Sequence, residues 1–142
     1  MPVADVKSIG RWSSNRYNSM APHVVWVFGH SFVRRAAYRV QQLHEPNPVA
    51  SQDVAFRWCG VGGMGIAQLQ QLVALARRFE GLQFPDLIVI HLGGNDLVHM
   101  GRNALREAIF LKITKLAEQY PNAPIAWSHM VPRCKWGPGI KS

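Results

Sequence analysis

The chain has 142 residues, of which 48% are hydrophobic, and sixteen Lys and Arg against eight Asp and Glu give it a formal net charge of +8. This length suits one domain with an apolar core of its own and excludes two domains of ordinary size. The charge fits nucleic acid or another anionic partner, but the basic residues are scattered without a long run, so it fits an ordinary solvated surface equally well.

The cysteines and the apolar runs indicate the compartment. Cys59 lies in a glycine-rich loop and Cys134 in a tail rich in proline and glycine, so the sequence implies no disulfide framework. No apolar run reaches the length of a membrane span, and residues 1–10 lack the apolar centre of a signal peptide. We therefore expect an intracellular protein, cytoplasmic or nuclear, with no membrane partner.

The first 22 residues form a separate segment. They are polar, are broken by proline and are too few to fold alone. Gly10 suits the end of one short helix, and Ser13 or Ser14 suits the cap of the next. We interpret residues 1–22 as a linker or remnant that precedes a domain over residues 23–142.

The remainder alternates strands and helices. Apolar residues at helical spacing predict helices over 31–43, 66–79 and 103–120, and β-biased runs predict strands over 24–28, 53–58, 85–92 and 124–127. Residues 87–92 are almost continuously apolar, which is typical of a central parallel strand with both faces covered. This order predicts a three-layer α/β/α fold of flavodoxin-like type, with a parallel sheet and right-handed crossovers.

The third predicted helix has an apolar side. Its members recur every three or four residues, so we expect them to face the core. These residues are Leu105, Ala108, Ile109, Ile113, Leu116 and Ala117.

Three loops follow the predicted strands and carry Ser31, Gly63 and Asn95. In an open parallel sheet, such loops open at one edge, where ligands bind. A serine nucleophile, an N–H from a glycine turn and an asparagine amide are the parts needed to attack an ester carbonyl and stabilise the oxyanion. The sequence predicts this catalytic role with no cofactor or metal, because Asp96 as a lone carboxylate is better suited to cap the backbone of the loop that holds Asn95.

These loops resemble three motif blocks of the SGNH hydrolases, also called GDSL-type esterases. The blocks are Phe-Gly-His-Ser-Phe at 28–32, Gly-Val-Gly-Gly at 60–63 and Gly-Gly-Asn-Asp at 93–96. The resemblance covers residues 24–130 and implies that Ser31 is the nucleophile. It also implies that the Ser31 N–H, Gly63 and Asn95 stabilise the oxyanion formed from a small ester substrate.

The chain departs from this family in two respects. His30 and Phe32 replace the usual aspartate and leucine beside the serine, which changes the rim of the site but leaves the hydroxyl. The spacing Asp-x-x-His occurs at Asp96 and His99, within the third block, but not after the predicted strand over 124–127, so the block that supplies the catalytic base in the family is missing at its usual place, together with the C-terminal strand and helix that carry it.

A serine hydroxyl is a poor nucleophile until an imidazole takes its proton, so the missing block predicts weak or no turnover. Among the other histidines, His129 is the best-placed substitute because it follows a strand at the same edge. Two strand spacings, roughly 10 Å, separate that strand from the one that leads to Ser31. His91, near the end of a buried strand, suits an interior histidine, and Cys59 suits a small buried residue.

Residues 5–20 resemble the C-terminal motif of tyrosine recombinases, through Gly-Arg-Trp-Ser-Ser at 10–14. Met20 falls where that family has its nucleophilic tyrosine and Tyr17 lies one turn early, so we expect no covalent role for Tyr17. The combination resembles mobile, retrotransposon-type elements that carry both a recombinase and an esterase-like domain.

Three interpretations therefore remain open. The first is a truncated SGNH-type esterase acting on small esters. The second is a basic module, derived from a mobile element, that binds nucleic acid or protein. The third is a nonfunctional fragment. The oligomeric state is also open.

Overall fold

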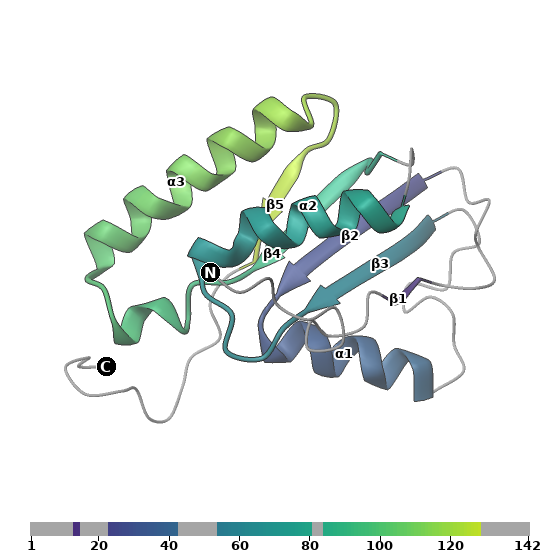
Figure 1. Cartoon of the computed structure of the whole chain (residues 1–142), viewed down its shortest axis with the longest axis horizontal. Helices are drawn as coiled ribbons and strands as arrows, with labels where there is room; N and C mark the ends of the chain where they lie inside the picture. Colours follow the sequence, from purple (N-terminus) through teal and green to yellow (C-terminus); the bar gives the residue numbers. More distant parts are fainter. Residues whose placement is uncertain (1–12, 15–22, 43–53, 81–83, 129–142) are drawn as a thin grey trace.

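The computed structural model describes residues 13–14, 23–42, 54–80 and 84–128. The predicted alternation of strands and helices in the domain is confirmed (Figure 1). In chain order the elements are β1 (Ser13–Ser14), β2 (His23–Gly29), α1 (Ser31–Gln42), β3 (Val54–Gly60), the 3-10 turn η2 (Ile66–Gln68), α2 (Leu69–Glu80), β4 (Leu87–His91), the 3-10 turn η3 (Asp96–Val98), α3 (Arg102–Gln119) and β5 (Ile125–Trp127).

The strands form one sheet in the order β1-β3-β2-β4-β5. Strands β2, β3, β4 and β5 are mutually parallel, so the predicted parallel sheet is confirmed. The strand that leads to Ser31, β2, lies between β3 and β4, and β5 lies two places from it, as expected. A parallel pair needs a crossover between its strands, and the helices supply these crossovers.

Ser13 and Ser14 form β1, which pairs with β3 in antiparallel orientation, with Ser13 opposite Trp58 and Ser14 opposite Arg57. The edge of β3 offers backbone N–H and C=O groups, and this pairing satisfies part of them. The helix that Ser13 or Ser14 is predicted to cap lies outside the described residues. The other residues of the 1–22 segment, including Tyr17 and Met20, lie outside the described residues, so their interpretation stays a prediction.

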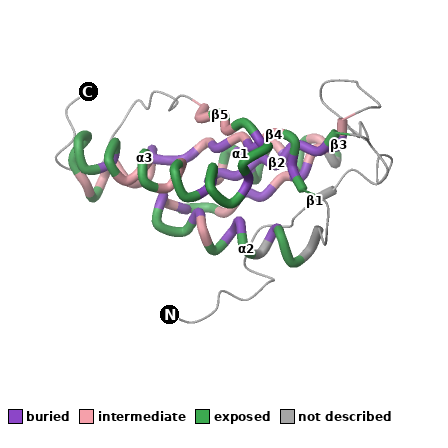
Figure 2. The backbone as a smooth tube through the Cα atoms, turned by 90° about the horizontal axis from the view of Figure 1, so that it is seen from above, coloured by how far each residue is buried: buried purple, intermediate pink, exposed green. Residues whose placement is uncertain are grey.

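Helices cover both faces of the sheet, which confirms the three-layer α/β/α architecture. Successive side chains of a strand point to opposite faces. On one face, Val25 and Val27 of β2 pack against Val33 of α1. On the other, Trp26 and Phe28 join the larger core, which includes α2 and α3. Figure 2 shows buried positions along the strands and exposed ones along the helices.

Helix α3 has a narrower buried side than its sequence predicts. Leu105 and Leu116 are buried, and Ala108 and Ile109 pack against the core at its border. Ala117 is exposed, contrary to expectation, because each residue turns about 100° from the one before it and Leu116 already faces the core.

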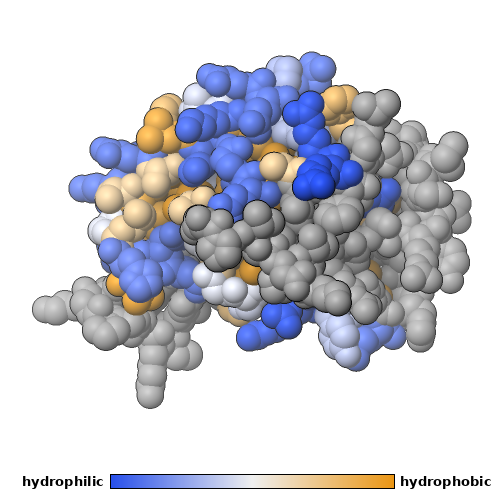
Figure 3. Space-filling view, viewed as in Figure 1, coloured by the Kyte–Doolittle hydropathy of each residue, from blue (hydrophilic) through white to orange (hydrophobic). Residues whose placement is uncertain are grey.

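The outer side of α3 carries large apolar groups. Phe110 is 70% exposed and Leu111 is 60% exposed. Figure 3 shows apolar side chains over the region of α3, among hydrophilic ones. None of the helices in the described part of the chain has the length and apolarity needed to span a membrane.

Candidate active site

The carboxyl ends of three neighbouring strands lie at one level. Gly29 of β2 is the register partner of both Gly60 of β3 and His91 of β4. The backbone N–H of Val61 donates to the Gly29 carbonyl at 3.0 Å and extends this ladder by one residue. The loops that carry Ser31, Gly63 and Asn95 therefore leave the sheet at the same edge, as the strand order predicted.

A close approach between α1 and β3 places Ser31 at this edge. A Cβ on Gly60 would lie 2.2 Å from the backbone nitrogen of Arg34 and 2.7 Å from its Cα. Only glycine permits this contact, so α1 can begin directly against the end of the sheet. Ser31 is the first residue of α1 and is half-buried.

The cap of α1 is His30 and not Ser31. The His30 carbonyl accepts from the Arg34 N–H at 3.2 Å, and its Nδ1 accepts from the Phe32 N–H at 3.3 Å. An acceptor Nδ1 places the ring proton of a neutral His30 on Nε2. Serine before a helix is most often a cap, but here the histidine takes that role.

Gly63 has a backbone conformation that favours glycine. Its φ is +73°, a left-handed value that favours glycine, and nothing lies within 4 Å of the place where a Cβ would be. The residue is exposed in a turn in which the Met64 N–H donates to the Val61 carbonyl at 3.3 Å. The open space beside its backbone leaves room for a ligand.

The loop after β4 holds the loop after β3. The Asn95 amide nitrogen donates to the Met64 carbonyl at 3.0 Å. Because Met64 directly follows Gly63, this bond joins the loop of Asn95 to the loop of Gly63. Both carboxylate oxygens of Asp96 accept from the Ile66 N–H, at 3.0 and 3.2 Å. Asp96 thus caps backbone, but in the neighbouring loop and not in its own as expected. Since the Asn95 nitrogen carries two hydrogens and one is directed at Met64, an oxyanion would have to use the other.

Sequence reasoning missed the pairing of His91 with Ser128. The Nδ1 of His91 lies 3.0 Å from Ser128 Oγ, and the Ser128 N–H donates to the Ile90 carbonyl at 2.8 Å, which fixes Ser128 at the end of β5. His91 is half-buried and not an interior residue, and partial burial lowers its pKa. The signal in the sequence was its place at the carboxyl end of β4, next to the strand that leads to Ser31.

The His91 ring contacts both neighbours of Ser31. Its centroid lies 4.8 Å from that of His30 and 5.9 Å from that of Phe32. Among the residues that the structure describes, no hydrogen bond joins the Ser31 hydroxyl to an imidazole. The other candidate base, His129, lies outside the described residues and stays a prediction.

Cys59 offers no rival nucleophile at neutral pH. Cys59 is 2% exposed, as predicted, and burial raises its pKa to about 12, so it remains a thiol at neutral pH. No group of three or more His, Cys, Asp or Glu in the described ranges is arranged to hold a metal ion.

Comparison with known proteins supports the α/β fold. No protein-family model matches the chain, and no curated protein sequence matches it. The chain is similar to the solved structure of a candidate platelet activating factor from Streptococcus pneumonia, with a TM-score of 0.54 and 20% sequence identity. The match covers 83% of this chain and 50% of the other, so the chain spans half the length of that relative. At this identity the likeness supports the shared α/β architecture alone.

Proposed function

We propose that this chain is an SGNH-type, serine-dependent esterase domain that hydrolyses small carboxylic esters slowly. The observation that carries the proposal is the coupling of the loops at the carboxyl edge. Ser31 begins the central crossover helix, and the bonds of Asn95 to Met64 and of Asp96 to Ile66 hold the other two loops together. Such an edge is where parallel α/β sheets place their reacting groups.

The proposed chemistry is acyl transfer through Ser31. Its hydroxyl attacks the ester carbonyl, and the oxyanion that forms is stabilised by the backbone N–H groups of Ser31 and Gly63 and by the Asn95 amide. The alcohol leaves, and water then hydrolyses the acyl-serine. Ser31 stands at the amino end of α1, where unpaired N–H groups favour negative charge.

Among the described imidazoles, we assign the base to His91. His91 takes the proton of Ser31 and gives it to the leaving alcohol. The hydrogen bond between its Nδ1 and the Ser128 hydroxyl fixes the orientation of the ring. A hydroxyl can fix the tautomer of the imidazole, but it carries no charge to stabilise the imidazolium as an aspartate does. This difference is the physical reason to expect slow turnover.

Replacing Ser31 by alanine tests the proposal. We expect hydrolysis of p-nitrophenyl acetate to fall to the rate of the buffer, because the variant loses the only atom that forms the acyl intermediate. Thr114→Ala is the control, since Thr114 is an exposed hydroxyl that bonds only to the Phe110 carbonyl of its own helix. Equal rates for Ser31→Ala and the unaltered protein would contradict the proposal.

The pH dependence tests the assignment of His91. Burial lowers its pKa below the ordinary value of about 6.5. A base must be neutral, so the rate is expected to rise with pH, to reach half its maximum below about pH 6.5 and then to stay level. We expect His91→Ala to lower the rate by about 100-fold and to remove this rise.

His23→Ala is the matched control for His91. His23 begins β2 at the opposite edge of the sheet, so its loss should leave both rate and profile unchanged. If His91→Ala retains the profile of the unaltered protein, then another group is the base, and His129 is the next to replace.

A further inference from the structure

A cavity lies away from the Ser31 edge, between α2 and the C-terminal end of α3. Its volume is about 410 Å³, within the range of small-molecule sites. Arg77 and Tyr120 stand near the helix ends that lead to β4 and β5, and so near the amino edge of the sheet, whereas Ser31 lies at the carboxyl edge. The cavity therefore lies apart from the proposed esterase site.

Two buried polar atoms on the walls of this cavity have no hydrogen-bond partner. They are the Tyr120 hydroxyl and the Gln70 amide nitrogen. An unsatisfied buried group of this kind costs roughly 1–3 kcal/mol, and native structures contain few of them. Tyr120 is only 4% exposed. A phenylalanine could make the same ring contact with Trp26, whose ring centroid lies 5.3 Å away, without that cost.

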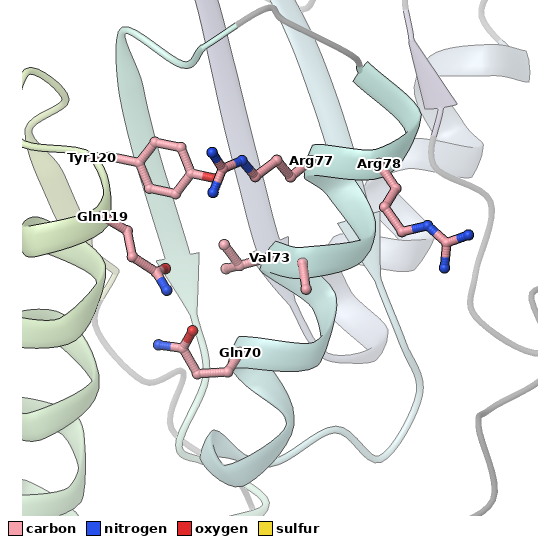
Figure 4. A pocket seen from close by; sticks show the side chains of 7 residues that line it. Gln70, Val73, Arg77, Arg78, Gln119 and Tyr120 are labelled. Atoms are coloured by element: carbon pink, nitrogen blue, oxygen red, sulfur yellow. The ribbon is translucent and has the colours of Figure 1, made fainter.

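Each of these groups can donate a hydrogen bond. Burial raises the pKa of Tyr120, and the nearby Arg77 charge lowers it by less, so the phenol keeps its proton at neutral pH. Figure 4 shows the Arg77 guanidinium in front of the Tyr120 hydroxyl and the Gln70 amide turned toward the cavity. No acidic side chain is among the described residues that line it.

Part of the remaining wall is apolar, beside Arg78 and Gln119. Val73 and Ala74 lie between Gln70 and Arg77 on α2, and residues three, four and seven apart share one side of a helix. An arginine beside two neutral donors suits an anionic oxygen pair. The apolar stretch suits a short hydrocarbon chain, which inorganic phosphate lacks.

We propose that this cavity binds a small organic acid, with its carboxylate on Arg77, Tyr120 and Gln70 and its hydrocarbon part on Val73 and Ala74. Ser31 takes no part in this binding. The same protein can therefore bind the acid whether or not Ser31 hydrolyses esters.

Titration calorimetry with hexanoate tests the proposal on the full chain. We expect saturable binding with one site per chain and a Kd below about 10 mM. Tyr120→Phe removes only the unpartnered hydroxyl, so it should weaken hexanoate binding by about 10-fold while leaving the urea midpoint unchanged or raised. That split between affinity and stability is not expected of a tyrosine with a purely structural role.

Arg77→Gln and Arg78→Gln form a matched pair, because both remove one positive charge from the last turn of α2. Arg78 also lines the cavity, but Figure 4 shows its side chain directed away from Arg77, Tyr120 and Gln70. We expect Arg77→Gln to weaken hexanoate binding by at least 10-fold and Arg78→Gln to change it by less than twofold. Equal losses in the two variants would mean attraction by the net charge alone and would overturn the proposal.

Two further probes identify the chemistry. Hexanol has the same hydrocarbon chain without the charge, and inorganic phosphate has charge without the chain. We expect both to bind at least 10-fold more weakly than hexanoate. Binding of hexanol or phosphate as tight as that of hexanoate, or no saturable binding of hexanoate, would also overturn the proposal.

Discussion

Gly60→Ala is expected to lower the free energy of unfolding by about 3 kcal/mol, at the upper end of the usual cost of overpacking. The added Cβ would lie 2.2 Å from the Arg34 nitrogen, 2.7 Å from the Arg34 Cα and 2.8 Å from the Val33 carbonyl carbon. These are backbone atoms of α1 and cannot turn aside as a flexible side chain can. The helix would have to move off β3, and Ser31 would move with it.

Gly62→Ala is the matched control for Gly60→Ala. A Cβ on Gly62 would meet only the Nη1 of Arg34, at an ordinary contact distance of 3.5 Å. We expect this variant to stay within about 0.5 kcal/mol of the unaltered protein in urea unfolding. If Gly60→Ala is as stable as Gly62→Ala, then α1 does not lie against β3 as described.

The second large effect is expected from Leu116→Ala, which should lower the free energy of unfolding by about 3–5 kcal/mol. Leu116 is fully buried in the core that joins α3 to the sheet, and its truncation leaves a cavity as well as losing apolar burial. Urea unfolding followed by circular dichroism measures the change.

Leu111→Ala provides the same chemical change on the same helix. Leu111 is 60% exposed, so its truncation should cost less than about 0.5 kcal/mol. Similar losses at the two positions would show that α3 presents a different side to the core. The pair therefore tests the orientation of α3.

Much of the fold could be predicted because local patterns determine it. The apolar run over residues 87–92 indicated an inner strand. This run forms β4, which lies between β2 and β5. In contrast, the pairing of Ser13 and Ser14 with β3 joins residues more than 40 positions apart, and no local pattern predicts such a contact. On α3, periodicity identified the buried Leu116 but could not set the width of the buried side, and Ala117 fell beyond it.

For the candidate site, strand order was sufficient to predict which loops share an edge, and it placed Ser31, Gly63 and Asn95 there. The contacts among the loops could not be predicted, because they depend on backbone conformation. The Asn95 amide donates to the carbonyl of Met64, the residue directly after Gly63, whose φ is positive. His91 was misjudged because a residue at the end of a strand can face either side of the sheet, and Ser128 beside it follows another strand.

The central claim is that Ser31 is a nucleophile in the folded protein, and covalent labelling tests it most directly. The protein is treated with a fluorophosphonate, which reacts with activated serines, and the modified peptide is identified by mass spectrometry. We predict a single adduct on Ser31 that is absent from Ser31→Ala and from protein unfolded in urea. No adduct on the folded protein, or an adduct that persists in Ser31→Ala, would contradict the esterase proposal.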